Sequence, residues 1–496
     1  MVRVRIVKTA SGSFAVQVVH YRGKRAVIRK HIGSAKTEED ISLLKDMARQ
    51  WIQESSGQQS LLPEKTDDAI LLGKYKYRGF RYGLVETIIR QIFNILGLDI
   101  LDGKTDKMFF DLVLMRIVEP TSKRQSQRLL SAFFGIQYDL TAIYRSLPGF
   151  SRLKDEVENQ LIGFAQKYLG FNFSFVLYDI TTLYFETFTE DELRKTGYSK
   201  DNKVGQPQIL VGLVVSTEGF PLSFTLFEGN TFEGSTLIPV ILDFKKKHKI
   251  RMLTVVADAA MISHKNITAL KEAGLSYIVG ARLGNMNKDT ISRIDQELTR
   301  MDGAFMRLTT TDGFLVVQFS AKRYAKDKHE MEKQLEKAKR IMEGKQERKR
   351  NKFLSRNTKT KYALNTAVIE KTKRLLGIKG YHTDLTLPEQ TIIDRYSDLW
   401  QVERAFRISK HDLTARPVYH FRKQTIIAHL LICFISLAVL KYLEIKTGTS
   451  ARSVMDKLKS ITDGRMLNTL TRKEIIMRGE ITDEIQALLS KINSPH

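Results

Sequence analysis

Alternating apolar and polar residues open the chain. Residues 1–31 contain VRVRIV, FAVQVVHY and AVIRKHI, and a two-residue alternation is typical of strands. This segment carries eight basic residues and no acidic one. From about Arg81 to Leu169 the apolar positions recur with a helical period, as in LVETIIRQIFNILGL. The pattern predicts a basic β-rich module with a helix over 1–60 and a helical region over 66–169, separated by the polar connector SSGQQSLLPEKTDD.

The middle of the chain changes to strands. Three runs, FNFSFVLYDITTLYFE, QPQILVGLVVS and GFPLSFTLFEGN, have short connections, which suggests an antiparallel meander. They are followed by a helix-like stretch, the apolar strand RMLTVVADAA, a helix from Ser263 to Glu272 and the strand LSYIVGARL. Three strands followed by helix, strand, helix and strand is the element order of an RNase H-like core, so we expect a mixed α/β fold.

The second half of the chain contains a basic interruption. Between Lys322 and Arg374 there are 19 basic and 7 acidic residues, which supplies +12 of the total charge. A charged helix there is expected either to clamp DNA or to be merely solvated. We expect the following domains: 170–285, first part of the RNase H-like core; 286–387, basic α+β insertion domain; 388–445, second part of the core; 446–496, C-terminal helical tail.

The overall charge of the chain limits the class of partner that it is expected to bind. The chain has 80 Lys and Arg against 55 Asp and Glu, a formal charge of +25, which favours nucleic acid as the polyanionic partner. Cys433 is the only cysteine, so one chain forms no disulfide. The apolar run IIAHLLICFISLAVL has fifteen residues, fewer than the roughly 20 that span a bilayer, and predicts a buried helix and no membrane partner. The sequence lacks a G-x-x-x-x-G-K-[ST] loop, so we expect no nucleotide cofactor.

Two aspartates follow apolar strands. Asp179 ends FSFVLYD and Asp258 ends LTVVAD. Either alone fits a turn or a helix cap as well as a functional site. On neighbouring strands, however, the pair brings two like charges together, which is costly unless a cation or a proton lies between them. Mg²⁺ and Mn²⁺ take oxygen ligands and are the natural candidates.

A third acid lies in YSDLWQVERAFRISK, which reads as one helix. Tyr396, Glu403 and Lys410 follow one another at seven-residue steps and are expected along one helix face. Without further context, Glu403 and Arg407 are better explained as a surface ion pair. Trp400 is expected in the core, as is usual for tryptophan on an amphipathic helix.

Together, Asp179, Asp258 and Glu403 resemble the Asp-Asp-Glu triad of DDE transposases of bacterial insertion sequences. More narrowly, the chain is similar to the branch with the signature Y-x2-R-x3-E-x6-K and an insertion in the RNase H-like domain. Tyr396, Glu403 and Lys410 match that spacing, whereas Leu399 stands at the arginine position. Other familiar segments are DITTLYFE, GYSKDNK, GLVVSTEGFPL, EGNT, ADAAMIS and VERAFRISKHDLTARPVYH.

The resemblance implies an activity and partners. Such an enzyme recognises terminal inverted repeats with its N-terminal region, so the resemblance implies that the helical region over 66–169 binds DNA. It cleaves DNA ends by metal-dependent hydrolysis and joins 3′-OH ends to target DNA, as a dimer in the synaptic complex. The three acids are catalytic and bind a pair of Mg²⁺ or Mn²⁺ ions. DNA contacts near the site are implied for Tyr396, Lys410, Arg404 and Arg407. The location implied is the cytoplasm of a bacterial or archaeal cell, at the nucleoid.

Two alternatives remain open from the sequence. One is an RNase H-like nuclease that cuts without strand transfer, because it shares the same acids and metals. The other is a catalytically silent, transposase-derived DNA-binding regulator.

Overall fold

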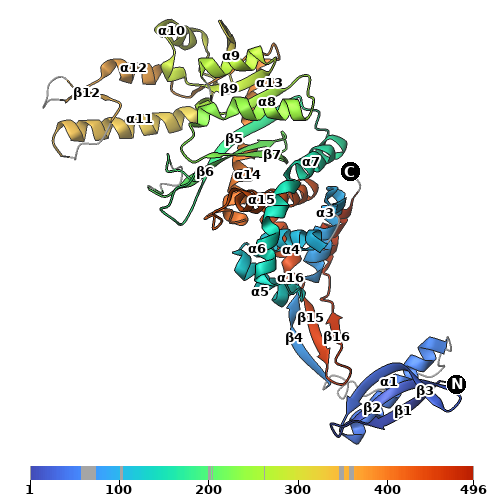
Figure 1. Ribbon diagram of the computed structural model, residues 1–496. Helices are drawn as coiled ribbons and strands as arrows, with labels where there is room; N and C mark the ends of the chain where they lie inside the picture. Colours follow the sequence, from blue (N-terminus) through green and yellow to red (C-terminus); the bar gives the residue numbers. More distant parts are fainter. Residues whose placement is uncertain are drawn as a thin grey trace. The chain divides into compact units, whose positions relative to one another are not determined.

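The computed structural model describes residues 2–56, 74–100, 104–198, 203, 205–261, 263–345, 351–356 and 362–494 (Figure 1). Most of the expected connector, and parts of the segments GYSKDNK and ADAAMIS, lie outside the described residues. The chain divides into two units. The first comprises 1–90, 124–140 and 452–493, and the second comprises 91–123, 141–451 and 494–496.

The first unit begins with a three-stranded antiparallel sheet in the order β1-β2-β3. Its strands are β1 (Val2–Lys8), β2 (Phe14–Arg22) and β3 (Arg25–Ala35), and α1 (Glu38–Ser56) follows. The strands form where the alternation predicted them. Apolar side chains of α1 pack on one face of the sheet, around Val16, Val18, Ile32, Ala35, Leu44, Ala48 and Leu470.

The rest of the first unit joins segments that are far apart in sequence. Strands β4 (Tyr75–Arg81), β15 (Asp463–Asn468) and β16 (Glu474–Met477) form a sheet in the order β16-β15-β4. The C-terminal segment was expected to be helical, and this prediction is wrong in part, because β15 lies between α16 (Ala451–Ser460) and α17 (Asp483–Asn493). The pairing of β15 with β4 joins residues almost the whole chain apart, so no local pattern predicts it. Helices α3 (Gly83–Ile95) and α5 (Lys123–Phe134) also contribute residues to this unit.

The helical part of the second unit surrounds one long apolar helix, α15 (Lys423–Thr447). It is the one described helix long and apolar enough to cross a membrane, but 94% of its most apolar window is buried inside the protein. A core helix is therefore the better description, as the sequence predicted. The neighbouring helical elements are η1 (Leu98–Ile100), α4 (Lys104–Val118), α6 (Leu140–Phe150), η2 (Ser151–Leu153) and α7 (Lys154–Tyr168).

An eight-stranded mixed sheet forms the centre of the second unit, in the order β10-β11-β14-β9-β8-β5-β6-β7. Strands β5, β6 and β7 form the expected antiparallel meander, and β8 and β9 continue parallel to β5. This is the arrangement of an RNase H-like core and confirms the predicted fold class. The five strands are β5 (Phe175–Tyr184), β6 (Gln208–Val215), β7 (Pro221–Glu228), β8 (Thr254–Ala257) and β9 (Ser276–Ala281). The helices that precede β8 and β9 are α8 (Leu237–Lys247) and α9 (His264–Glu272).

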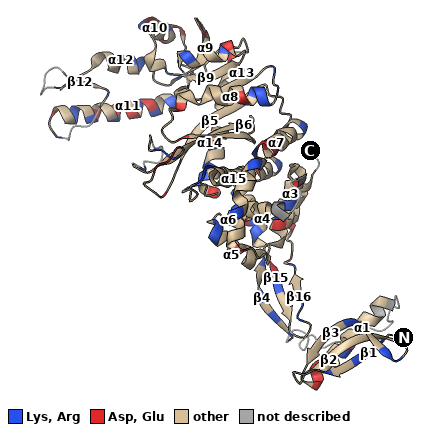
Figure 2. Cartoon of the chain, in the orientation of Figure 1, with Lys and Arg blue, Asp and Glu red and all other residues tan. Residues whose placement is uncertain are grey.

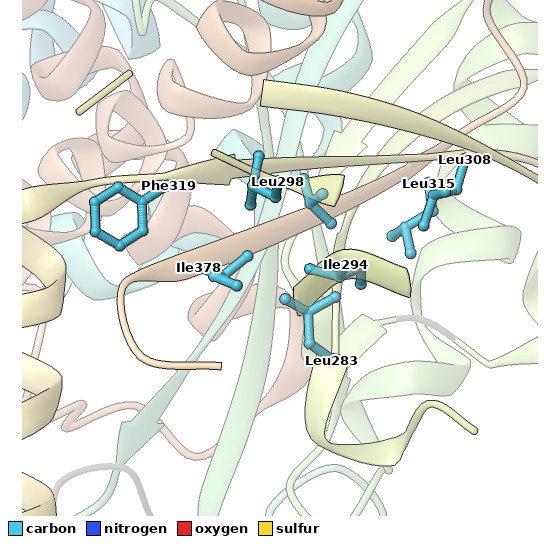
Figure 3. Packing of buried hydrophobic residues seen from close by; sticks show 8 residues of the cluster. Leu283, Ile294, Leu298, Leu308, Leu315, Phe319 and Ile378 are labelled. Carbon is cyan, nitrogen blue, oxygen red and sulfur yellow. The ribbon is translucent and has the colours of Figure 1, made fainter. Parts of the chain in front are cut away.

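The segment 286–387, expected as an insertion domain, also contributes to this sheet. Its strands β10 (Phe305–Thr310), β11 (Gly313–Phe319) and β14 (Ile378–Thr383) extend the sheet beyond β9. Apolar side chains from these strands, from α10 (Lys288–Glu297) and from the turn after β9 form a common core (Figure 3). Beyond the sheet, α11 and the β12–β13 hairpin lie beside α12 (Figure 1). Their bounds are α11 (Ala321–Met342), β12 (Leu354–Arg356), β13 (Tyr362–Leu364) and α12 (Thr366–Arg374).

The stretch YSDLWQVERAFRISK is not one helix, so this prediction is wrong. Helix α13 (Glu389–Ser397) ends before Asp398, α14 (Trp400–Arg407) follows, and a π-helical turn covers Ile408–Asp412. At the break the backbone bonds span three residues, from the N–H of Leu399 to the Tyr396 carbonyl and from Gln401 to Asp398. This tighter turn separates α13 from α14.

Candidate active site

The two aspartates lie at the same level on adjacent strands. In the parallel pair β5 and β8, Tyr178 is opposite Ala257. Asp179 and Asp258 are each the next residue along, so the strand pairing brings their backbones side by side. The two apolar runs that precede the aspartates predicted both as strand-end residues. This holds for Asp258, but Asp179 lies within its strand, because β5 continues to Tyr184.

A cavity of about 420 Å³ unites the three predicted acids. Asp179, Asp258 and Glu403 all line it, and we name it the carboxylate cavity. They come from three elements, β5, the end of β8 and α14. The other lining residues are Ala259, Gly280, Ala281, Arg323, Lys379, Gly380, Tyr396, Ser397, Leu399, Trp400 and Val402.

Tyr396 fixes one of these carboxylates. Its hydroxyl group donates a 3.1 Å hydrogen bond to Oδ1 of Asp258, which also accepts a 2.7 Å bond from the backbone N–H of Ala259. The Tyr396 ring packs against Tyr381, with 4.8 Å between ring centroids. Burial, followed by the negative charge of Asp258, raises the pKa of Tyr396 above its usual value, so the phenol stays protonated as a donor.

Gly280 leaves the space for this hydroxyl group. A Cβ atom at Gly280, on strand β9, would lie 2.5 Å from Oη of Tyr396 and 3.0 Å from Cβ of Ala259. Any larger residue therefore displaces the tyrosine or the end of β8. Sequence reasoning did not single out this glycine.

Two cations of the 286–387 segment line the cavity, and sequence reasoning missed both. Lys379 lies on β14, with Nζ 4.4 Å from the centroid of the Tyr396 ring. Burial lowers the pKa of Lys379 and Arg323 lowers it further, whereas the charges of Asp258 and Glu403 act in the opposite direction. Arg323 lies near the start of α11. The sequence showed only that this segment is basic, not which of its cations reach the acids.

The other predicted DNA contacts lie elsewhere. Arg404 donates a 2.6 Å hydrogen bond to Oε1 of Glu444 on α15, and Arg407 is exposed on α14. Lys410 borders a separate cavity of about 40 Å³, lined mainly by apolar residues. Of the four predicted contacts, Tyr396 alone lines the carboxylate cavity.

Two residues near Glu403, Leu399 and Trp400, also line the cavity. Leu399, at the signature arginine position, is 7% exposed and lines the cavity, so that position supplies no positive charge. Trp400 was predicted in the core, but it is 47% exposed and also lines the cavity. The buried residues of α14 are Val402, Ala405 and Phe406, and Trp400 projects from a different side of this helix.

A family model described as Transposase DDE domain matches residues 172–439, more than half of the chain. The chain belongs to this transposase family. The matched range contains the three acids that line the carboxylate cavity. No curated protein matches the chain.

Solved transposase structures are similar at low sequence identity. A cryo-EM structure of the piggyBac transposase synaptic complex with hairpin DNA has a TM-score of 0.40 and 11% identity, over 76% of this chain and 78% of that chain. The Mos1 transposase paired-end complex with left transposon end has a TM-score of 0.16 and 9% identity, over 47% and 66%. The pre-cleavage Mos1 transpososome has a TM-score of 0.15, with the same identity and coverage.

DDE transposases generally use divalent metal ions, and the donor chemistry of the cavity fits such ions. Carboxylate oxygens are the ligands that Mg²⁺ prefers. Among the residues that the structure describes, however, no group of three or more His, Cys, Asp and Glu side chains is close enough to hold an ion. The three acids therefore share a cavity without forming a closed ligand set, and Lys379 lies among them as a counter-charge.

Proposed function

We propose that the chain is a transposase of an insertion sequence that binds terminal inverted repeats, hydrolyses phosphodiester bonds at the element ends and joins the 3′-OH ends to target DNA. The observation that carries the proposal is the carboxylate cavity within the DDE domain, lined by Asp179, Asp258 and Glu403. Three carboxylates from three separate elements bring charge of one sign to one cavity, which favours a cationic ligand there.

In this mechanism Asp179, Asp258 and Glu403 would hold Mg²⁺ or Mn²⁺. Bound divalent ions supply activation of a water or 3′-hydroxyl and stabilisation of the leaving oxygen. Tyr396 keeps the Asp258 carboxylate in one orientation through its 3.1 Å hydrogen bond. Tyr396 and Leu399 are both buried and form part of the cavity wall.

Lys379 and Arg323 supply the positive charge of the site in this proposal. Both line the cavity, whereas the signature arginine position is Leu399 and Arg404 is paired with Glu444. A phosphate that enters the cavity meets the lysine as a point charge and the guanidinium as a planar donor. The spacing of Tyr396, Glu403 and Lys410 supports membership of the Y-x2-R-x3-E-x6-K branch of bacterial insertion sequences, with these two cations in place of the arginine.

Double-stranded DNA is the proposed partner, as terminal repeats and as target. The formal charge of +25 supports a polyanionic partner, and α11 exposes basic side chains such as Lys326, Lys333 and Lys337. Neutralising these three lysines is expected to flatten the salt dependence of DNA binding, by about one unit of slope for each lost phosphate contact. An unchanged slope would mean that α11 is merely solvated. A dimer in the synaptic complex and a place at the bacterial or archaeal nucleoid complete the proposal.

The decisive experiment uses Asp179→Asn, which removes a charge with little change in shape. With Mg²⁺ present, this variant is expected to bind the element ends but not to cut them, whereas Asp243→Asn, on the exposed side of α8, retains cleavage. Normal cutting by Asp179→Asn would refute the catalytic assignment. A labelled 3′-end separates the alternatives: a nuclease gives cut ends without joined products, and a silent regulator gives neither.

A further inference from the structure

The basic sheet of the N-terminal module lies outside the range matched by the family, 172–439. Residues 2–37 contain no acid and nine basic residues, namely Arg3, Arg5, Lys8, Arg22, Lys24, Arg25, Arg29, Lys30 and Lys36. The first turn of α1 carries Glu38, Glu39 and Asp40 instead. In Figure 2 the strands of this sheet carry Lys and Arg, whereas acidic residues gather where α1 begins. The charges of the module are therefore segregated between the sheet and the helix.

The sheet has one covered face and one open face. Val4, Val16 and Val18 pack toward α1. Side chains alternate between the two faces of a strand, so Arg3 and Arg5 lie on the face away from α1. The register places Arg5 opposite Gln17, which is opposite His31 on the third strand. We name this surface the open face.

One cross-strand row of the open face is polar and basic, because Arg5 and His31 are exposed and Gln17 lies half-buried between them. In the next row Arg3 is exposed and Ile28 is 53% exposed, whereas Val19 between them is buried. At one end, the turn between β2 and β3 adds Arg22, Lys24 and Arg25, which are also exposed. A surface with this composition is complementary to a polyanion rather than to an apolar partner.

We propose that the open face binds duplex DNA in the major groove. Adjacent strands are about 4.8 Å apart, so three strands span roughly 10 Å, which fits a groove about 12 Å wide. Sheets and β-ribbons are known readers of DNA grooves. The proposal rests on the proposed function, because it assigns recognition of the terminal repeats to a sheet.

Roles follow from the chemistry of the side chains. Arg3 and Arg5 project from the open face and contact guanine edges, and Gln17 contacts adenine, the pairings that their donor and acceptor geometry favours. Arg22, Lys24 and Arg25 at the turn contact phosphates and set the register on the duplex. A-form RNA has a deep, narrow major groove that side chains do not read, so the surface is assigned to DNA.

The test uses the full chain without divalent metal and a duplex that the wild-type chain selects from a random DNA pool. Binding is measured by fluorescence anisotropy over a series of KCl concentrations. Arg3→Ala/Arg5→Ala is expected to weaken binding roughly tenfold or more and to lower the salt slope by about two. Lys45→Ala/Arg49→Ala removes the same charge from α1 and is expected to leave both unchanged. Gln17→Ala is expected to reduce the preference over a shuffled duplex without changing the slope.

Each opposite result overturns the proposal. Wild-type affinity and slope in Arg3→Ala/Arg5→Ala, with an unchanged melting temperature, would show that the open face does not contact DNA. If Lys45→Ala/Arg49→Ala lost more affinity than Arg3→Ala/Arg5→Ala, recognition would lie on α1 instead. If duplex RNA competed for binding more strongly than duplex DNA, the ligand would not be DNA. Failure of the proposed function would give a different result. The open face would still bind the selected sequence, but that sequence would be absent from the ends of the element.

Discussion

The hydroxyl group of Tyr396 donates a 3.1 Å hydrogen bond to Oδ1 of Asp258 and thereby joins α13 to the end of β8. Burial and the adjacent carboxylate raise the pKa of Tyr396, so the donor keeps its proton at every physiological pH. This hydrogen bond gives Tyr396, a residue of the signature, a structural role. It orients one of the three carboxylates before any substrate enters.

Removing this hydroxyl group tests that task. Groups that orient metal ligands typically change metal affinity or activity by about 10–100-fold. Tyr396→Phe is therefore expected to need more Mg²⁺ for DNA cleavage, by about that factor, with little change in DNA binding. Cleavage rates titrated with Mg²⁺ provide the measurement. Tyr442→Phe removes a phenol outside the carboxylate cavity and serves as the control; equal Mg²⁺ dependence in the two variants would contradict the assignment.

Gly280→Ala should disturb the same hydrogen bond from the opposite side. The new Cβ atom would lie 2.5 Å from Oη of Tyr396, so the phenol must move away from Asp258. We expect reduced cleavage comparable with that of Tyr396→Phe. In Gly280→Ala/Tyr396→Phe the two losses should not add, because both act on one contact. Single-turnover cleavage rates of the four proteins measure this coupling, and simple additivity would show that the glycine acts elsewhere.

Lys379→Met removes the counter-charge beside Asp258 and Glu403. Burial outweighs the attraction of the carboxylates and lowers the pKa of Lys379 overall, so removing this charge is not expected to lower the melting temperature without divalent metal. Added Mg²⁺ is expected to raise the melting temperature of this variant more than that of the wild type, while cleavage decreases. Differential scanning fluorimetry with and without Mg²⁺ shows the effect. Lys379→Arg should restore the charge, and Lys288→Met, an exposed lysine on α10, is the control.

Arg404 is expected to stabilise the fold rather than to contact DNA. Its guanidinium is 2.6 Å from the carboxylate of Glu444, which is 8% exposed and also paired with Lys441. Because Lys441 remains, Arg404→Ala should cost about 1–3 kcal/mol of unfolding free energy. Thermal unfolding measures the loss, and the salt slope of DNA binding should not change. A flatter slope with normal stability would instead support a phosphate contact.

The buried Lys123 is expected to make the free energy of unfolding depend on pH. Burial, with help from the nearby charge of Arg116, lowers the pKa of Lys123 to about 7. The unfolded chain keeps this proton up to the ordinary lysine pKa near 10.4, so unfolding takes up a proton between these two values and stability rises with pH in that window. Lys123→Met should be more stable than the wild type at pH 6, and the difference should shrink by pH 10. Melting temperatures of the two proteins across this pH range measure the difference. A wild type more stable than Lys123→Met at pH 6 would contradict the prediction.

Local pattern in the sequence determined much of this protein. Alternation predicted the strands of the N-terminal module and the RNase H-like order of strands and helices. It also identified Asp179 and Asp258, because each directly follows an apolar run that has to enter a buried strand. The resemblance to DDE transposases then singled out Glu403, which the helical pattern alone explained better as a surface charge.

Long-range pairing decided the rest. Lys379 reaches the acids only because β14 pairs with β9, and Arg323 follows from the same extension of the sheet. Tyr396 and Glu403 line the carboxylate cavity from two successive helices, whereas Lys410 lies in the π-helical turn and borders another cavity. Periodicity records which side of an element is apolar. It does not record which distant element lies opposite, and the composition of the carboxylate cavity depends on that.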